Sequence, residues 1–250
     1  MKELVLCDDD KLEQVLPLCK KYGLGIEIQG FYKPTLIDKH DEFLAKYKKL
    51  LPKRISKYLH APFADLCLGS ATPKIVEATK FYFDCAYRVA KELGCKRITV
   101  HHGYVPGTSF IPNWNKRAVN FWNEYLQDKK DIAFDMENML EWNADSLSEI
   151  IDSANIKNLG INLDIGHAHC NSKESVINWI KKLGNRITYV HLHNNHGKQD
   201  EHLGLAKGNI NIKKVLNTLN KYCPDAVWAL ECKVEDMEES ILLLKKFKFI

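Results

Sequence analysis

Short apolar runs alternate with longer segments of helical periodicity along the whole chain of 250 residues. A short apolar run has the length of a buried strand, and apolar residues three and four positions apart form one buried face of a helix. Parallel strands need helical crossovers, so this alternation predicts repeated βα units and a parallel sheet. We expect strands at residues 4–7, 25–29, 55–60, 97–101, 132–137, 159–164, 186–191 and 226–231.

The segments between and after these strands predict eight helices. Thr72 and Pro73 form a typical helix start, a capping residue followed by a proline at the first helical position, and Gly94 is a typical helix end. Eight βα units close into a (β/α)8 TIM barrel, an α/β fold that here forms a single domain over residues 1–250. The helices are expected at residues 11–22, 38–50, 73–93, 114–126, 144–154, 173–183, 212–222 and 237–246.

Composition narrows the class of protein. Hydrophobic residues make up 45% and charged residues 27% of the chain, as in ordinary globular proteins. The net charge of +4 is carried by scattered lysines, so it does not demand a nucleic acid partner. The eight cysteines include no CxxC pair, and neither a secretion signal nor a membrane span is apparent, so we expect reduced thiols and a cytoplasmic protein without a membrane partner.

The stretch from residue 189 to residue 210 contains four of the ten histidines of the chain. It reads YVHLHNNHGKQDEHLGLAKGNI and includes Asp200 among its histidines. Imidazole and carboxylate groups bind zinc, manganese and iron, and a loop after a strand presents such groups to an open cleft. A polar loop that is merely rich in histidine explains this stretch equally well when it is considered alone.

Six successive predicted strands end in residues that are metal-ligand types. The carboxyl ends of the strands line the active-site mouth of such a barrel, so these side chains are expected to converge. A hydrogen-bonded polar residue would explain any one of them, whereas six at equivalent positions favour a shared divalent metal site. Three ligands of this kind around an ion leave a position open for substrate, as in catalytic sites. The strand-end residues are His60, His101, Glu137, Asp164, His191 and Glu231, and His167, Asp200 and His202 lie just beyond them.

The order of these motifs resembles the xylose-isomerase-like barrel superfamily. The resemblance extends over essentially the whole chain, and its most specific parts are Asp-x-x-His at 164–167 and Asp-x-His at 200–202 followed by KGNI. This superfamily includes sugar and sugar-phosphate isomerases and epimerases, and also endonuclease IV, a zinc enzyme that cuts DNA at abasic sites. The motifs are HAPF, VHHG, MENM, LDIGH, VHLHNN, DEHLGLAKGNI and LEC.

Two ligand sets follow from the resemblance. The isomerase branch implies one divalent ion, zinc or manganese with magnesium as a further option, and catalytic proton transfer by Glu137 and Glu231. The endonuclease branch implies three zinc ions. The single ion would be held by Glu137, Asp164, His191 and Glu231. The three-ion centre would add a site of His60, His101 and Glu137 and a site of His167, Asp200 and His202.

Three functions remain open at this point. The first is a metal-dependent isomerase or epimerase whose partner is a small sugar or sugar phosphate. The second is a zinc phosphodiesterase resembling endonuclease IV, with DNA as the partner, although this chain is shorter than that enzyme and its segment 60–73 has no arginine for phosphates. The third is a metal-binding barrel without turnover.

Four further residues are minor candidates. Glu27 and Gln29, at the end of the second strand, face the mouth in only one register. His193 either contacts substrate or hydrogen-bonds to a metal ligand. Trp142, shortly after Glu137, is a candidate wall of the substrate site.

Overall fold

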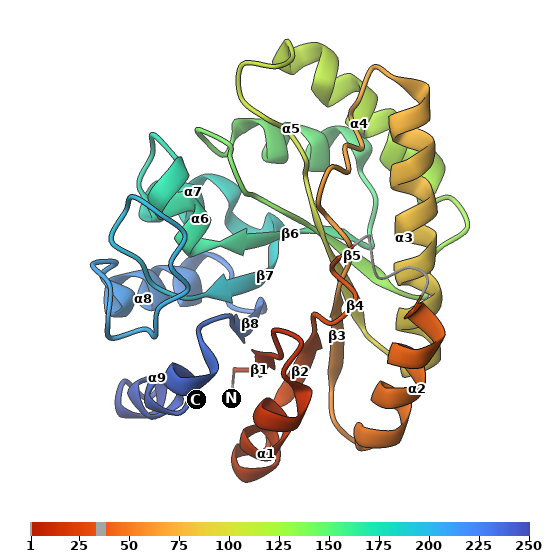
Figure 1. Ribbon diagram of the computed structural model, residues 1–250. Coiled ribbons are helices and arrows are strands. Elements are labelled where there is room, and N and C mark those ends of the chain that lie inside the picture. The colour runs from red at the N-terminus through yellow and green to blue at the C-terminus, as the bar shows by residue number, and fades with distance from the viewer. Residues whose placement is uncertain (1, 34–38) are drawn as a thin grey trace.

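The computed structural model describes residues 2–33 and 39–250. Its centre is a closed barrel of eight parallel strands in sequence order, in which β1 pairs with both β2 and β8 (Figure 1). The predicted TIM barrel is therefore confirmed. The strands are β1 (Leu4–Cys7), β2 (Gly25–Ile28), β3 (Lys57–His60), β4 (Arg97–His101), β5 (Ala133–Glu137), β6 (Leu159–Asp164), β7 (Ile187–Leu192) and β8 (Val227–Leu230).

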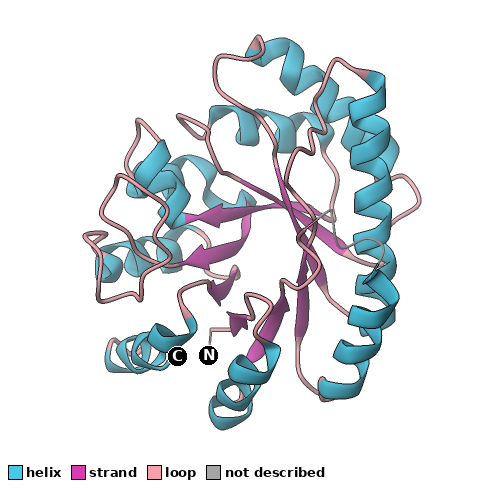
Figure 2. Cartoon of the chain, in the orientation of Figure 1, coloured by secondary structure: helices cyan, strands magenta, loops and turns pink. Residues whose placement is uncertain are grey.

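Helices surround the barrel, and each long helix before β8 connects one strand to the next (Figure 2). Helix α3 follows Pro73 as expected and ends at Gly94, which adopts a left-handed φ of 71°, but the side chain of Thr72 accepts no capping hydrogen bond. The helices are α1 (Leu12–Tyr22), α2 (His40–Leu50), α3 (Pro73–Leu93), α4 (Ile111–Tyr125), α5 (Asp145–Ala154), α6 (Ile165–Asn171), α7 (Val176–Leu183), α8 (Ile212–Tyr222) and α9 (Val234–Lys246). Residue 38, the predicted start of the second helix, lies outside the described residues.

Within residues 2–33 and 39–250 there is one α-helix more than the eight predicted, because α6 begins directly after β6. The carboxylate of Asp164 accepts a hydrogen bond from the backbone N–H of His167 at 2.7 Å and so caps this helix. The short helix has the sequence IGHAHCN, which contains too little apolar periodicity to be recognised. Its start places His167 one helical turn beyond the end of β6.

The pleat of the strands separates two sets of buried side chains. Side chains on alternate positions face the helices and form the main core, for example Leu6 and Ile26. The opposite set faces the barrel axis and forms a small inner cluster of Val5, Cys7, Tyr58, Tyr189 and Ala229. His60, Glu137, Asp164 and His191 have the same parity on their strands as the inner set, so the pleat directs them into the barrel.

Two expectations about the chain environment can be compared with the structure. Within residues 2–33 and 39–250, no helix is both long enough and apolar enough to cross a membrane. The eight cysteines, all among the described residues, form no disulfide.

Candidate metal centre

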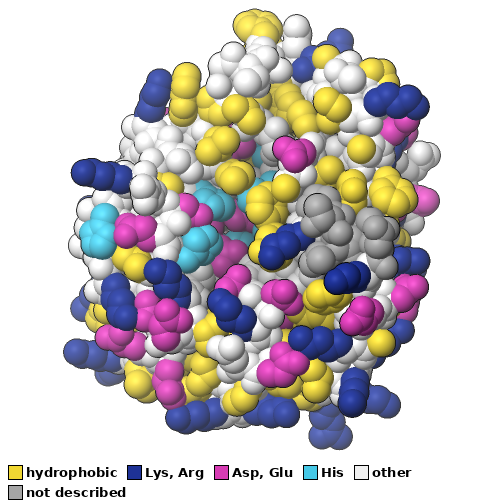
Figure 3. Space-filling model, in the orientation of Figure 1, with side chains coloured by type: hydrophobic (Ala, Val, Ile, Leu, Met, Phe, Trp, Pro, Cys, Tyr) yellow, Lys and Arg dark blue, Asp and Glu magenta, His cyan; other side chains and the backbone are white. Residues whose placement is uncertain are grey.

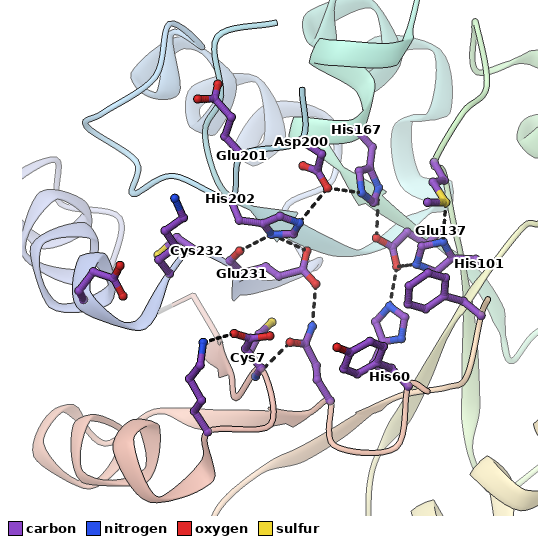
Figure 4. Close-up of a pocket in the computed structure, with 18 residues that line it drawn as sticks. Cys7, His60, His101, Glu137, His167, Asp200, Glu201, His202, Glu231 and Cys232 are labelled. Carbon is purple, nitrogen blue, oxygen red and sulfur yellow. Dashed lines mark hydrogen bonds and ion pairs between the residues drawn. The ribbon is translucent and has the colours of Figure 1, made fainter. Parts of the chain in front are cut away.

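The nine residues proposed as ligands lie together at the carboxyl end of the barrel. A cavity of about 590 Å³ opens there, and seven of the nine line it (Figure 4). Asp164 and His191 lie beneath its floor, and both are fully buried. Figure 3 shows this face from outside, with histidine and acidic side chains gathered at its hollow and hydrophobic side chains along one margin. The cavity-lining members are His60, His101, Glu137, His167, Asp200, His202 and Glu231.

Their ligand atoms form three groups, two of which share a member. Within each group the imidazole nitrogens and carboxylate oxygens lie within 4.8 Å of one another, a spacing that one ion could bridge. Glu137 belongs to two of the groups. The groups are His60, His101 and Glu137; Glu137, Asp164, His191 and Glu231; and His167, Asp200 and His202.

Three of these histidines are oriented by backbone carbonyl groups. The Nδ1 atoms of His60, His167 and His202 lie 2.8 Å from the carbonyl oxygens of Ala61, Asn138 and Glu231 respectively. Each Nδ1 can only donate to a carbonyl, so each ring presents Nε2 to the centre. Hydrogen bonds of this kind fix the rings of metal-binding histidines.

The donor set fits divalent ions. Asp200 Oδ2 lies 2.8 Å from His202 Nε2 and 3.1 Å from His167 Nε2, so either a proton or a shared cation must lie between each nitrogen and this oxygen. One oxygen each of Glu137 and Glu231 is buried without a hydrogen-bond partner. Such orphaned acceptors are costly unless a cation compensates them. Imidazole and carboxylate ligands suit zinc, manganese and iron.

Electrostatics keeps the central carboxylates ionised. Burial disfavours the charge of Glu137, but the charge of His191 and hydrogen bonds from His191 and His60 outweigh burial and hold the pKa of Glu137 well below its usual range. Burial lowers the pKa of His101 to about 3, so this ring is neutral and its lone pair is available at neutral pH. Burial also opposes protonation of His202, yet the hydrogen bond to Asp200 and the charge of Glu231 raise its pKa to about 10. A metal ion at His202 would therefore displace a proton.

The loop that carries Asp200 and His202 is held by the asparagines that follow β7. Asn194 donates to the carbonyl of Leu205 at 2.9 Å, and its own side-chain oxygen accepts from the N–H of Ile210 at 3.0 Å. His202 adopts a left-handed φ of 47°, a conformation that costs energy in a residue with a side chain and occurs preferentially at functional sites. The loop therefore holds its ligand groups at defined positions.

His193 supports a ligand rather than lining the cavity. It is fully buried, and its Nε2 lies 3.0 Å from both oxygens of Asp164. Gly166 makes this approach feasible, because a Cβ atom there would lie 1.9 Å from Cε1 of the His193 ring. Of the two roles expected for His193, the structure favours hydrogen bonding to a ligand.

Two other expectations meet a different outcome. Trp142 is 47% exposed and does not line the cavity, so it is no wall of the substrate site; Lys173 Nζ instead lies 3.6 Å from the centre of its ring. Glu27 is fully buried and does not line the cavity, whereas Gln29 does. An aromatic wall of Tyr32, Phe63 and His101 was not anticipated: Phe63 stacks on His101 at 4.3 Å between ring centres and on Tyr32 at 5.8 Å.

Comparison with known proteins identifies relatives. A family model described as xylose isomerase-like TIM barrel matches residues 16–247. The uncharacterized protein MJ1311 of Methanocaldococcus jannaschii is 31% identical over 201 residues, which cover 76% of this chain and 69% of that protein.

Two solved structures share the fold over nearly the whole chain. A D-tagatose 3-epimerase-like protein has a TM-score of 0.78 and 26% identity, and the match covers 99% of this chain and 97% of that one. The TTHB071 protein of Thermus thermophilus, in a crystal soaked with ZnCl2, has a TM-score of 0.79 and 23% identity, with 98% and 96% covered.

Proposed function

The chain belongs to the xylose isomerase-like TIM barrel family, and on that premise we propose that it is a divalent-metal-dependent isomerase or epimerase acting on a sugar or sugar phosphate. One observation carries the proposal: Glu137 and Glu231 converge with Asp164 and His191 at the cavity, within 4.8 Å of one another. The similarity to a D-tagatose 3-epimerase-like protein supports an epimerase.

A divalent ion bound by Glu137, Asp164, His191 and Glu231 would polarise the carbonyl and hydroxyl oxygens of a bound sugar. Glu137 is the proposed base, because its carboxylate is ionised and one of its oxygens has no hydrogen-bond partner. It removes the proton from the carbon next to the sugar carbonyl, the electrons of the broken C–H bond form a carbon–carbon double bond, and the π electrons of the carbonyl move onto its oxygen. Glu231, protonated for this step, delivers its proton to that carbon or its neighbour, and a carbonyl re-forms as the double bond breaks. The face and the carbon that the proton reaches decide between epimerisation and isomerisation.

The aromatic residues and the polar residues of the cavity would bind different parts of a sugar. Tyr32, at the outer end of the stack, offers a ring to the apolar face of a sugar. Gln29 and the carboxylates offer hydrogen-bond partners to its hydroxyl groups. A cavity of about 590 Å³ lies within the usual size range of small-molecule sites.

Proton exchange at a sugar carbon tests the proposal. Protein loaded with Mn²⁺, Zn²⁺ or Mg²⁺ is incubated in D2O with a panel of ketoses, aldoses and their phosphates, and the products are followed by NMR. We expect deuterium at a carbon next to the carbonyl together with an epimer or isomer, and strongly reduced exchange with Glu137→Gln, whose amide cannot accept the proton. Absence of exchange on every sugar, in protein shown to hold the metal, would contradict the proposal.

A second candidate function is zinc-dependent phosphodiester cleavage of the endonuclease IV type. The observation that favours it is the presence of two additional groups with two imidazoles and one carboxylate each, a donor set typical of zinc. Among the described residues that line the cavity, however, there are two lysines, Lys11 and Lys233, and no arginine, and Lys11 pairs with Asp9. Three tightly bound zinc ions per chain and cleavage of an abasic-site duplex would favour this function over isomerisation.

A further inference from the structure

Glu27 is a fully buried carboxylate inside the barrel. It lies on β2, whose pairing with β1 sets Glu27 opposite Cys7 of the inner cluster. A buried charge is costly unless it is paired and hydrogen-bonded. Both oxygens of Glu27 lie 3.0 Å from Nε2 of His191, a residue 164 positions away in the chain. Nε2 of His191 is therefore the nearest partner of Glu27, and the side-chain amide of Gln29 lies further away at 3.4 Å.

The other nitrogen of His191 faces the proposed metal position. Nδ1 lies 3.0 Å from Glu137 Oε1, 3.1 Å from Glu231 Oε2 and 3.7 Å from Asp164 Oδ2. A carboxylate can only accept, so Glu27 requires a proton on Nε2. With Nε2 protonated, the lone pair of the neutral ring is on Nδ1, where a metal would bind.

Gln29, two residues after Glu27 and one residue beyond the end of β2, acts on Glu231 in a similar way. Its Nε2 donates to Glu231 Oε1 at 2.6 Å and lies 3.4 Å from Glu27 Oε1. Its Oε1 accepts from the backbone N–H of Asp9 at 3.2 Å, which determines which end of the amide faces Glu231. One oxygen of Glu231 is thereby held, and Oε2 is left without a hydrogen-bond partner.

The backbone of Gln29 is held as well. Its N–H donates to Oδ1 of Asp8 at 2.9 Å, and Oδ2 of Asp8 accepts from the hydroxyl of Tyr47 at 2.7 Å. All these groups are buried, so the rotamer of Gln29 is supported on both sides. Precise placement of a metal ligand depends on such supporting contacts.

We infer that Glu27 and Gln29 are positioning residues of this centre: Glu27 selects the His191 tautomer that directs Nδ1 to the metal, and Gln29 turns the free oxygen of Glu231 toward it. The inference rests on the metal binding assumed in the proposed function. Glu27 belongs to none of the three ligand groups described above, although it lies with Cys7, His191 and Glu231 in a further group of possible ligands. The inference assigns to Glu27 and Gln29 control over two ligands, one from β7 and one just after β8.

The test compares metal affinity in Glu27→Gln, Glu27→Asp and Gln29→Met, measured by competition of Zn²⁺ and Mn²⁺ with a chelator. Glu27→Gln should weaken one ion by about 10–100-fold, the usual effect of losing a carboxylate that supports a ligand histidine. Glu27→Asp, which keeps the charge, should recover part of that affinity. In Zn²⁺-loaded protein, ¹⁵N spectra of the histidine rings should show protonated Nε2 for His191 in the parent chain and a changed pattern in Glu27→Gln.

Asp135→Asn is the matched control, because Asp135 is also a buried carboxylate facing the barrel axis but pairs with Arg97, away from the ligand groups. If Glu27→Gln binds metal as tightly as the parent and only melts earlier, as Asp135→Asn does, then Glu27 has a structural role alone and the inference is wrong. A parent chain that binds no divalent ion would overturn the proposed function and this inference together. Should Glu27→Gln fail to fold, Gln29→Met decides: a fall in kcat at nearly constant KM supports the inference, and an unchanged kcat refutes it.

Discussion

Glu137→Gln is the substitution that we expect to affect activity most. The carboxylate lies at the end of β5, where Oε1 is 3.0 Å from His191 Nδ1 and Oε2 is 3.2 Å from His60 Nε2 and 3.5 Å from His101 Nε2. The two oxygens therefore serve two different ligand groups. An amide keeps the shape but has one acceptor oxygen, so its NH2 group must face one of the two groups.

The magnitude has two parts. Loss of a positioned acid–base group reduces the rate by about 10²–10⁴, which corresponds to roughly 2.7–5.4 kcal/mol of transition-state stabilisation. In addition, one ion should bind more weakly, because the amide withdraws a negative charge and a ligand oxygen from one group. The isomerase reaction and the phosphodiesterase reaction should both be affected, since Glu137 belongs to the ligand sets of both.

The assay measures metal content per chain, deuterium exchange at a sugar carbon and cleavage of an abasic-site duplex side by side. Glu141→Gln is the matched control, because Glu141 is a buried carboxylate on the same β5–α5 connection that belongs to none of the ligand groups. Burial raises the pKa of Glu141 to about 7, so an amide resembles its protonated form. Full activity of Glu137→Gln, in whichever reaction the parent catalyses, would refute the assignment of the chemistry to Glu137.

Three further outcomes are expected. His202→Ala should lose at most one ion per chain and remain folded, because His202 lies in a loop outside the core. Metal analysis tests this, with His196→Ala, an exposed histidine of the same loop, as the control. An unchanged number of ions per chain in His202→Ala would show that His202 binds no ion. Burial raises the pKa of Asp8 to about 7, so the stability that its protonated form provides is lost as pH rises from about 4 through 7. Urea unfolding should show Asp8→Asn gaining stability relative to the parent by up to about 1.4 kcal/mol per pH unit across that window, and a constant difference would contradict the shift. Trp122→Ala should lower the free energy of unfolding by about 3–5 kcal/mol, because Trp122 is fully buried in the core. Trp142→Ala should lower it by less than about 1 kcal/mol, because Trp142 is 47% exposed. Equal losses of stability in the two variants would contradict this distinction.

The strand ends are the part of the site whose position was predicted from the sequence. His60, His101, Glu137 and Asp164 close their strands as expected, whereas β7 continues one residue beyond His191 and β8 ends one residue before Glu231. These shifts do not move the side chains to another face, because the period of two along a strand is set by residue number and not by where pairing stops. Whether the nine residues bind metal remains a prediction, to which the structure adds their mutual distances.

The contacts that support the proposed ligands were not predicted from the sequence. Nothing in the local sequence connects Glu27 with His191 or His193 with Asp164, because these pairs depend on how strands distant in sequence are placed around the barrel. The two registers open to Glu27 on the sequence alone were separated only by the pairing of β2 with β1 and β3. Trp142 was misjudged for a related reason: the direction of a loop residue is set by the loop's tertiary contacts and not by its distance from Glu137.

The sequence by itself determined the number and order of the strands, the closure of the barrel and the end of the barrel at which polar side chains gather. These features follow from apolar periodicity, from short-range chain geometry and from the fact that parallel strands all end on the same side of the sheet. The tertiary structure alone decided which nitrogen of each histidine faces the centre, which carboxylate oxygens stay free and that α6 begins on Asp164 itself. Those features depend on hydrogen bonds between groups far apart in the chain, and their geometry exists only once the barrel has closed.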